Sequence, residues 1–462
     1  MTEVETRAAQ RLHERVEAII AILDARGAGA LDTAAEAQLR GQLADLHPAD
    51  IAFILESLPL DDRLTTWQLV KSGQDGDILL EVSDAVRESL IADMDRHEIL
   101  AAAETLDADE LADLVDDLPS AMLPELMASL DAEQRAQLQS AMSYRDDQLG
   151  ALMDFEMVTI REDVSLEVVL RYLRRFDELP AQTDKLFVVN QDNLLTGVLP
   201  LHWLLVNPPE QMVSAVMAPD VNTFHPDDDV YEVAQAFERY DLVTAPVIDV
   251  HGHLIGRITV DAMVDVIREE ADSEALSRGG LREEEDIFAS VWKSLRNRWA
   301  WLALNLMTAF IASRVIGLFE GSIERLVALA ALMPIVAGIG GNSGNQTITM
   351  IVRGLALNQI SPASARRLWR KEMAVALING VVWGGVIGIA AWALYDNLAL
   401  GVVMTAAMAL NLLLAAFCGV GIPMLMTRFG RDPAIGSSVL ITAMTDSGGF
   451  FIFLGLATAF LV

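Results

Sequence analysis

The sequence is poor in the residues that build disulfides, zinc sites and hydrolase centres. Cys418 is its only cysteine, which excludes an internal disulfide and a zinc site made of cysteines alone. It has seven histidines and none after residue 253, so the C-terminal part offers no histidine cluster of the kind that metal hydrolases use. Residues 1–140 show no glycine-rich phosphate loop and no nucleophile arrangement. We therefore do not expect an enzyme.

Basic residues are also scarce, with 33 Lys+Arg against 66 Asp+Glu and a net charge of -33. This charge disfavours nucleic acid as a partner, because like charges repel. Yet 52% of the residues are hydrophobic, which excludes disorder. The two properties separate near residue 290: residues 291–462 hold 12 basic and 6 acidic residues, a net of +6. Residues 1–290 therefore hold 21 basic and 60 acidic residues, a net of -39.

Five long apolar runs follow residue 290 and predict a helical membrane domain over residues 291–462. Each run is long enough for a bilayer core, which needs about 20 residues. Buried helices of a soluble domain are the alternative, which five such runs in succession disfavour. We place the five spans at about 299–319, 327–352, 373–395, 400–427 and 434–461.

The basic residues around these spans predict an orientation. Lys293, Arg296 and Arg298 precede the first span, a group between Arg353 and Lys371 separates spans two and three, and Arg428 and Arg431 separate spans four and five. Cytoplasmic loops carry such excess positive charge. The N-terminus is charged and is not a secretory signal. We expect the N-terminus in the cytosol and the C-terminus outside.

A run of glycines and amides interrupts the second span. It contains Gly340, Gly341, Asn342, Asn345 and Gln346, which are poor groups to face lipid. Such polar stretches are tolerated where they are buried in protein or line water. Close helix packing by small residues is the alternative, and it explains the glycines but not the amides. We expect these residues to line a polar pathway.

Asp446 lies near the middle of the fifth span, in the stretch ITAMTDSGGFFIF. A carboxylate at this depth costs about 2.5–3.5 kcal/mol, so it marks a functional site by default. With Thr442 and Thr445 before it, the acid belongs to a set of oxygen ligands that suits Mg²⁺, Ca²⁺ or Mn²⁺. A symmetric dimer would place two such carboxylates around one ion. A protonated, structural Asp446 is the alternative.

Residues 1–145 predict an acidic, all-helical superhelical domain with a weak internal repeat. The segment LHPADIAFILESLP begins at residue 46 and LDADELADLVDDLP begins at residue 106. Each has a polar start, apolar residues at helical spacing and a terminal Leu-Pro. This pattern is typical of stacked helical hairpins, in which each unit buries its apolar face against the next.

Residues 150–272 predict an α+β pair of modules, about 150–212 and 213–272. Each half reads strand, turn, strand and helix, with the turn at QDN in the first copy and at DVHGH in the second. This order, in two copies, resembles a tandem pair of cystathionine-β-synthase-type (CBS) modules. Such pairs bind adenine nucleotides such as ATP through a Ser/Thr-x-Asp motif. Thr259 and Asp261 match it in the second copy only, and a helix cap at Thr259 is the alternative.

An acidic connecting segment, residues 261–290, joins the second module to the first span. Asp261, Asp265 and Glu269 are spaced by four residues, so they share one helix face and repel one another unless a cation binds. Glu270 follows directly. Asp432, between spans four and five, is predicted on the same side of the membrane. A solvated acidic linker is the alternative.

The whole chain, in this order of domains, resembles the MgtE-type magnesium channels. The resemblance rests on GGNSGNQ in the second span together with TDSGG in the fifth. It implies a homodimer in a bacterial cytoplasmic membrane that conducts Mg²⁺ and is gated by cytosolic Mg²⁺. By resemblance, Asp446 matches the pore carboxylate, Asn342 and Asn345 the pore-lining motif, and the connecting segment the gating helix. The regulatory acids it implies are Asp261, Glu269, Glu270 and Asp432, with Asp93 and Asp95 as candidates in the N-terminal domain.

The charge agrees with that scheme, because ions that bridge carboxylates of the -39 portion would favour its compact state. Compaction would draw the connecting helix over the pathway and close it. Two other functions stay open on the sequence. A proton-coupled carrier of Mg²⁺, Mn²⁺ or Co²⁺ would use Asp446 as its titrating group. A CBS-regulated anion channel would need basic groups in the spans, where the sequence has an acid.

Overall fold

The computed structural model describes residues 3–25, 31–70, 73–281, 286–356, 359–360, 362–431 and 436–462. The chain forms two compact units. Unit 1 contains Met1–Ala271 and Asp286–Ala289, and unit 2 contains Asp272–Glu285 and Ser290–Val462. Helix α15, Val260–Gly279, therefore begins in unit 1 and ends in unit 2.

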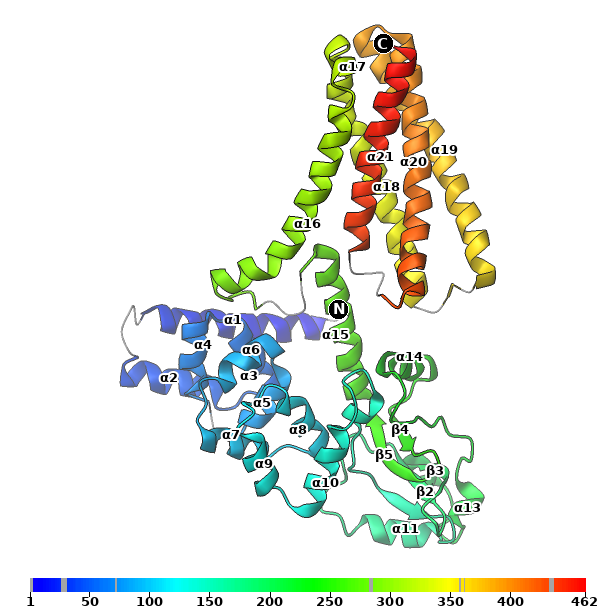
Figure 1. Ribbon diagram of the computed structural model, residues 1–462. Helices are drawn as coiled ribbons and strands as arrows, with labels where there is room; N and C mark the ends of the chain where they lie inside the picture. The colour runs from blue at the N-terminus through cyan, green and yellow to red at the C-terminus, as the bar shows by residue number, and fades with distance from the viewer. Residues whose placement is uncertain are drawn as a thin grey trace. The chain divides into compact units, whose positions relative to one another are not determined.

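The N-terminal part of unit 1 is helical, as predicted (Figure 1). Its helices are α1 (Glu3–Ala25), α2 (Thr33–Leu43), α3 (Pro48–Glu56), α4 (Leu60–Trp67), α5 (Asp75–Glu81), α6 (Asp84–Ile91), α7 (Arg96–Ala103), α8 (Ala108–Val115), α9 (Leu123–Ser129) and α10 (Ala132–Ala141). Their Leu, Ile and Val residues form one continuous core. Because helices this short are marginal alone, that shared core supplies most of their stability.

These short helices recur with a regular spacing. Those that begin at residues 48, 60, 84, 96, 108 and 132 start 12 or 24 residues apart. Asp95, Asp107 and Asp131 start three of them with capping boxes, in which the aspartate and the residue three places later satisfy each other's backbone N–H groups. The 60-residue shift between the two predicted repeat segments therefore corresponds to five steps of 12 residues.

Three arginines repeat the same contact along this part. In each, Nε donates to the carbonyl oxygen eight residues earlier, at the end of the preceding helix: Arg63 to Leu55 (2.9 Å), Arg87 to Leu79 (2.8 Å) and Arg135 to Met127 (2.6 Å). The last carbonyls of a helix have no partner within it. The arginine side chains therefore join each short helix to the next.

Two α+β modules complete unit 1. The first contains the 3₁₀ turn η1 (Leu149–Leu152), β1 (Thr159–Arg161), α11 (Leu166–Leu173), β2 (Lys185–Val189), β3 (Leu195–Pro200), α12 (Leu201–Val206) and α13 (Val213–Val216). The second contains α14 (Val230–Tyr240), β4 (Thr244–Ile248), β5 (Leu254–Thr259) and the start of α15. The predicted order of strand, turn, strand and helix is confirmed in both.

The sheets of the two modules match. Strand β2 pairs in parallel with β1 and antiparallel with β3, while β4 pairs antiparallel with β5 and forms a parallel bridge to Phe224. The turns between β2 and β3 and between β4 and β5 also meet: the amide of Leu195 donates to the carbonyl of Gly252 at 3.1 Å, and that of Leu254 to the carbonyl of Asn193 at 3.3 Å. These bonds join the modules into one pair.

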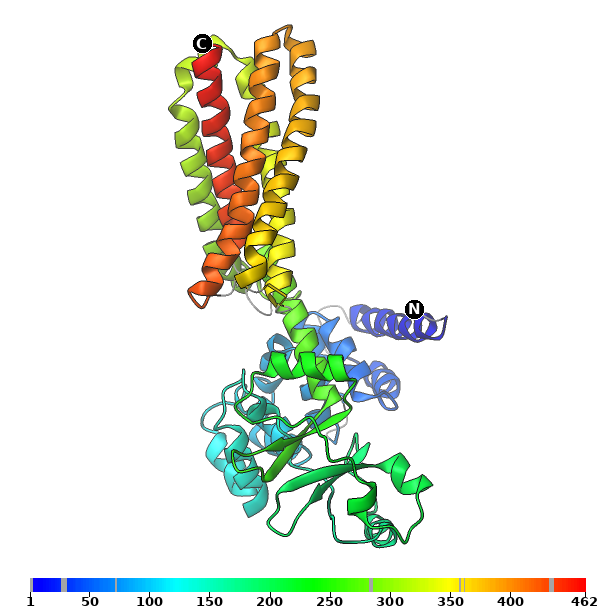
Figure 2. The ribbon, with the colours of Figure 1, turned by 90° about the vertical axis from the view of Figure 1, so that its right-hand side faces the viewer.

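Unit 2 is a bundle of long helices (Figure 2). They are α16 (Val291–Gly317), the short α17 (Glu320–Arg325), α18 (Ala328–Ala356), α19 (Pro362–Tyr395), α20 (Leu398–Arg428) and α21 (Ser437–Phe460). Helices α18, α20 and α21 supply most of its buried core. Most large apolar side chains on α16 and α19 are exposed instead, as expected of helices that face lipid.

All five segments predicted as spans are helical, but the prediction of five spans is not confirmed. Among the described residues, four helices are long and apolar enough to cross a membrane: Val291–Gly317, Ser364–Tyr395, Leu398–Arg428 and Ser437–Phe460. Helix α18 is the exception although it has 29 residues. Its glycines and amides, with Pro334 inside the helix, make it less apolar than its neighbours.

Candidate functional site

The glycine–amide segment is a continuous part of α18, despite Pro334. Asn342, Asn345 and Gln346 are three and four residues apart and therefore share one face of the helix. Asn342 and Gln346 are exposed, and Asn345 is half-buried. The amide oxygen of Asn345 is fully buried and has no hydrogen-bond partner among the described residues. The structure thus places the predicted polar groups together and leaves one buried amide oxygen without a hydrogen bond among the described residues.

The glycines of this segment admit a polar side chain from α20. Asn411 is fully buried, and its Nδ2 donates to the carbonyl of Val336 on α18 at 2.9 Å. A Cβ at Gly340 would collide with this amide, and one at Gly449 on α21 would lie 2.7 Å from it. Asn411 therefore fills the junction of three helices. The sequence analysis missed it, although a lone asparagine inside an apolar run of α20 was a detectable signal.

Helix α21 presents its threonines and Asp446 beside that junction. Thr445 is fully buried and packs opposite Gly341, where an added Cβ would lie 3.8 Å from its hydroxyl oxygen. Its hydroxyl donates to the carbonyls of Ile441 (2.9 Å) and Thr442 (3.1 Å), and the Thr442 hydroxyl donates to Ser438 (2.9 Å). Both hydroxyl protons are thus used within the helix, and the oxygens keep lone pairs for a cation.

Asp446 itself is half-buried, and α21 contains no Lys or Arg that could neutralise it from the same helix. The next residue, Ser447, has a buried hydroxyl without a partner among the described residues. Thr442 lies four residues before Asp446, so α21 carries a hydroxyl oxygen and the carboxylate on one face. Such an oxygen set is suited to a hard cation such as Mg²⁺ or Ca²⁺.

A second carboxylate of unit 2 was missed by the sequence analysis. Glu372, on α19, is only 5% exposed, and Thr347 of α18 donates to its Oε2 at 3.5 Å. Thr347 directly follows Gln346, so Glu372 contacts the end of the glycine–amide segment. Lys371 lies 3.3 Å from its other oxygen. The predicted third span begins at residue 373, which is why Glu372 was overlooked.

The predicted regulatory acids Asp261, Asp265, Glu269 and Glu270 are exposed on α15. Desolvation, together with the charges of Asp261 and of Asp113 on α8, raises the pKa of Asp265, and Arg268 acts against this. Glu270 is hydrogen-bonded to Tyr231 of α14, whose pKa is raised to about 12 by burial and by Glu270 and Glu269. The acids therefore bond to the second module and feel the charge of the helical part.

The remaining predicted residues are placed as follows. Thr259 is the last residue of β5 and is buried, and Asp261 lies in the first turn of α15. Asp95 caps α7 by accepting from the amides of Glu98 (3.0 Å) and His97 (2.7 Å), and these bonds lower its pKa. Asp93 accepts a hydrogen bond from Gln68 at 3.3 Å. Asp432 lies outside the described residues.

An acidic contact between α8 and the module pair was also missed. It contains Asp109, Glu110, Asp154 and Glu156. Burial and the charge of Asp154 raise the pKa of Asp109 to about 7, and burial also raises those of Glu110, Asp154 and Glu156. One cation faces this group, because Arg257 binds Asp154 at 2.7 Å. The folded chain thus holds more negative charge here than its own cations balance.

Comparison with known proteins matches three parts of the chain to family models. A family described as a divalent cation transporter matches residues 333–456, the MgtE intracellular N domain matches residues 46–147, and the CBS domain matches residues 213–269. The first match contains the three α18 amides and Asp446. The second contains the regularly spaced helices.

Two whole proteins are similar over nearly the entire chain. The magnesium transporter MgtE of Thermus thermophilus is 30% identical over 428 residues, which cover 91% of this chain and 94% of that protein. The magnesium transporter MgtE of Bacillus subtilis is 28% identical over 422 residues, with the same coverage. Among solved structures, the cytosolic domain of the Mg²⁺ channel MgtE in complex with ATP is 31% identical over 51% of this chain and 95% of that chain, with a TM-score of 0.46.

Proposed function

Since this chain belongs to the MgtE family of magnesium transporters, we propose that it is a Mg²⁺-selective channel for uptake across a bacterial cytoplasmic membrane. One observation carries the proposal: Asp446 of α21 lies one residue from Thr445, which packs opposite the glycine–amide segment of α18. An acid and orphaned amide and hydroxyl oxygens in an apolar bundle are costly unless a cation uses them. Transport of the ion needs no catalysis.

We propose that α18 crosses the membrane with the four apolar helices. It has 29 residues, more than a bilayer core of about 30 Å requires at 1.5 Å per residue. Five crossings place the N-terminus and unit 1 in the cytosol and the C-terminus outside. The basic residues in the N-terminal turns of α16 and α19 support this orientation.

The exposed amides support a homodimer. Asn342 and Gln346 lie uncovered on α18, and lipid cannot satisfy their hydrogen bonds. A second copy related by a two-fold axis would cover this face and bring two Asp446 carboxylates together. Two carboxylates at one site would hold a divalent ion, and a hydrated Mg²⁺ needs few direct protein ligands.

Cytosolic Mg²⁺ closes the channel in this proposal. Burial raises the pKa of Asp109 and of Asp154, and the charge of Asp154 adds to the shift of Asp109, so the compact arrangement disfavours these ionised carboxylates. Asp261, Asp265, Glu269 and Glu270 of α15 extend that charge toward the first membrane helix. A divalent cation that binds the compact arrangement more tightly than the open one shifts the population toward it. Asp93, Asp95 and Asp432 remain candidates for the same role.

We also propose that ATP binds the module pair and biases this equilibrium. Thr259 and Asp261 stand where β5 ends and α15 begins, so a nucleotide held there would act directly on the helix that leads to the membrane. ATP should shift the Mg²⁺ concentration at which the channel closes. Loss of this shift in Asp261→Ala would support the nucleotide site.

Flux of Mg²⁺ into liposomes tests the main proposal. The wild type should conduct when the cytosolic face has little Mg²⁺, and Asp446→Ala should abolish conduction while Asp446→Asn should weaken it. Asp396→Asn is the matched control, because Asp396 lies between α19 and α20 outside the apolar helices and Asn tolerates its positive φ of 47°. Retained flux in Asp446→Ala would refute the pore assignment, and dependence of uptake on a pH gradient would favour the proton-coupled carrier.

A further inference from the structure

The turn between β4 and β5 gathers two histidines and an aspartate. Asp249, His251 and His253 each have a ligand atom within 4.8 Å of the others. Oδ2 of Asp249 lies 3.0 Å from Nδ1 of His253 and 3.7 Å from Nδ1 of His251. The two rings lie side by side, with centroids 6.1 Å apart. The cluster is open to solvent, since the His251 side chain is 73% exposed.

The backbone fixes the aspartate in place. Its Oδ1 accepts from the amides of His251 (2.8 Å) and His253 (2.9 Å), and Gly252 closes the turn with a φ of +87°. Its other oxygen, Oδ2, is directed at Nδ1 of His253. Asp249 is therefore an oriented ligand whose second oxygen faces the histidines.

The first module shows that this turn does not require the histidines. Asn190 accepts from the amides of Asp192 (2.8 Å) and Leu194 (3.0 Å), in the same pattern as Asp249. Asn193 has a positive φ of 60°, as Gly252 in the second module has one of 87°. Thus Asp192 and Leu194 occupy the places of His251 and His253 with the same backbone. The histidine pair is an addition to the turn and is not a structural requirement of it.

The distances suit a small ion with nitrogen ligands. A tetrahedral ion with bonds of about 2.0–2.1 Å holds its ligand atoms about 3.4 Å apart, between the two measured nitrogen–oxygen distances. Two imidazoles and one carboxylate favour Zn²⁺, Co²⁺ or Ni²⁺ over Mg²⁺, which prefers oxygen ligands. Water would complete the coordination, since three protein ligands leave a position open.

We propose that Asp249, His251 and His253 form a binding site for a transition-metal ion of the Zn²⁺, Co²⁺ or Ni²⁺ class, separate from the Mg²⁺ pathway. The ion takes the place of the hydrogen bond between Nδ1 of His253 and Oδ2 of Asp249, and both atoms then give it a lone pair. Because the carbonyl of Gly252 accepts from Leu195 of the first module, an ion on this turn also stiffens the contact between the two modules.

Titration of the full-length protein in detergent with Zn²⁺, in the presence of excess Mg²⁺, tests the site. Excess Mg²⁺ occupies the carboxylate sites, and an Asp446→Asn background removes the proposed pore ligand. One equivalent of Zn²⁺ should bind, and it should be lost in His251→Gln and in His253→Gln. Co²⁺ in place of Zn²⁺ should give visible ligand-field bands of a nitrogen-bound ion in the parent protein and none in these variants.

Asp192→Ala, in the matching turn of the first module, is the control and should bind as the parent does. Unchanged Zn²⁺ affinity in both histidine variants would overturn the proposal, as would displacement of Co²⁺ by Mg²⁺. The glutamine variants keep a polar side chain on a turn whose fold does not need the rings. Their far-UV circular dichroism should therefore equal that of the parent. This test is independent of Mg²⁺ transport, which has its own readout.

Discussion

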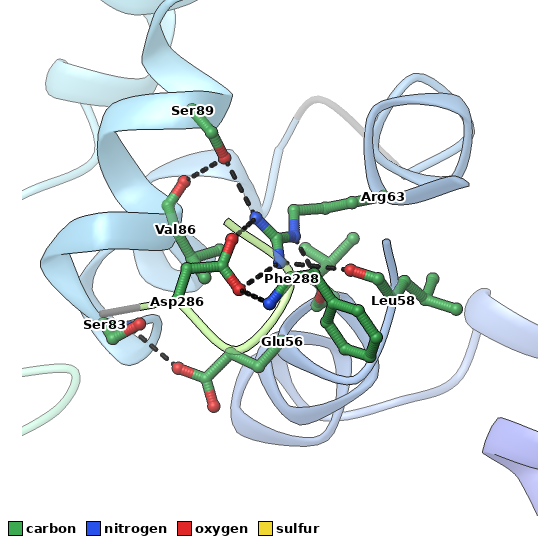
Figure 3. Close-up of polar contacts among 9 residues, drawn as sticks. Glu56, Leu58, Arg63, Ser83, Val86, Ser89, Asp286 and Phe288 are labelled. Atoms are coloured by element: carbon green, nitrogen blue, oxygen red, sulfur yellow. Dashed lines mark hydrogen bonds and ion pairs between the residues drawn. The ribbon is translucent and has the colours of Figure 1, made fainter. Parts of the chain in front are cut away.

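Arg63 binds the carboxylate of Asp286 with two parallel hydrogen bonds, from Nη1 to Oδ2 at 2.8 Å and from Nη2 to Oδ1 at 3.1 Å (Figure 3). The arginine side chain is fully buried, and it also donates to the carbonyls of Leu55 and Leu58. Asp286 lies only five residues before α16. The pair therefore fastens the segment that leads to the first membrane helix onto the N-terminal helices of unit 1.

Loss of the Asp286 carboxylate should release this segment. Asp286→Ala leaves the buried charge of Arg63 without its partner, and breaking a buried pair costs about 3–5 kcal/mol. In the parent, the Ala289 amide donates to the Asp286 carbonyl and is protected by this bond. Hydrogen exchange followed by mass spectrometry should therefore show faster exchange of residues 286–289 in the variant. Exchange at the Arg63 contacts around α3 should also rise.

Asp84→Ala is the comparison for Asp286→Ala, because Asp84 pairs with the related Arg87 at 3.5 Å but is 60% exposed. A surface pair of this kind contributes about 0–1 kcal/mol, so exchange should change little. Equal protection of residues 286–289 in the parent and in Asp286→Ala would contradict the fastening role.

The acidic contact should make unit 1 more stable at lower pH when divalent cations are removed. The pKa of Asp109 is about 7 in the folded chain against 3.8 ordinarily, so the folded state binds more protons between these values and stability falls as pH rises. From pH 6 to pH 8 the loss from Asp109 alone is about 1.4 kcal/mol. Exchange of the α8 amides, corrected for intrinsic rates, measures it.

Asp109→Asn should remove this part of the pH dependence and raise protection at pH 8. Saturating Mg²⁺ at pH 8 should do the same in the parent, since a bound cation relieves the repulsion that the proton relieves at pH 6. If the α8 amides of the parent protein were equally protected from exchange at pH 6 and pH 8 without Mg²⁺, folding would not raise the pKa of Asp109.

Neutralising the acids of α15 should raise the Mg²⁺ concentration that closes the channel. The double substitution Glu269→Gln and Glu270→Gln removes two ligands. In liposome flux measured against cytosolic Mg²⁺, the Mg²⁺ concentration for half-inhibition should rise by about 10-fold or more, which corresponds to about 1.4 kcal/mol. Tyr231→Phe separates the causes, since it removes the hydrogen bond to Glu270 but keeps both charges. If Tyr231→Phe alone reproduced the whole shift, packing of α14 would explain it rather than ion binding.

Periodicity and composition predicted the elements well, while contacts distant in sequence stayed hidden. Apolar runs located α16, α18, α19, α20 and α21, and four of these helices are long and apolar enough to cross a bilayer. Their amino acids do not reveal which side chain reaches a neighbour. In the sequence, Asn411 is one polar residue in an apolar helix. Only the structure shows that Gly340 and Gly449 leave space for its side chain.

The same limit applies to charge. A surplus of acids was evident, but the crowding of Asp109 against Asp154 arises only when α8 packs on the module pair. The capping role of Asp95 was likewise hidden, although Glu98 three residues later completes a capping box that the sequence contains. Local pattern located the amides of α18 and Asp446 of α21 on helices, while the contacts between helices came from the fold.

Gly340 and Asn411 should behave as a coupled pair in transport. Gly340→Ala places a methyl group against the Asn411 amide, and overpacking of this kind costs about 1–3 kcal/mol. Mg²⁺ flux and the thermal midpoint of the detergent-solubilised protein should both fall. Asn411→Ala alone should also lower them, because it removes the bond to Val336 and leaves a cavity between α18, α20 and α21.

Together the two substitutions should do less damage than their sum, because the new methyl group occupies space that the amide has left. A coupling free energy of about 0.5–3 kcal/mol is expected for residues in contact. Gly338→Ala is the matched control on α18, since an added Cβ there meets nothing within 4 Å. If Gly340→Ala and Asn411→Ala combined additively, the close approach of α18 to α20 would not be what positions the glycine–amide segment beside Asp446.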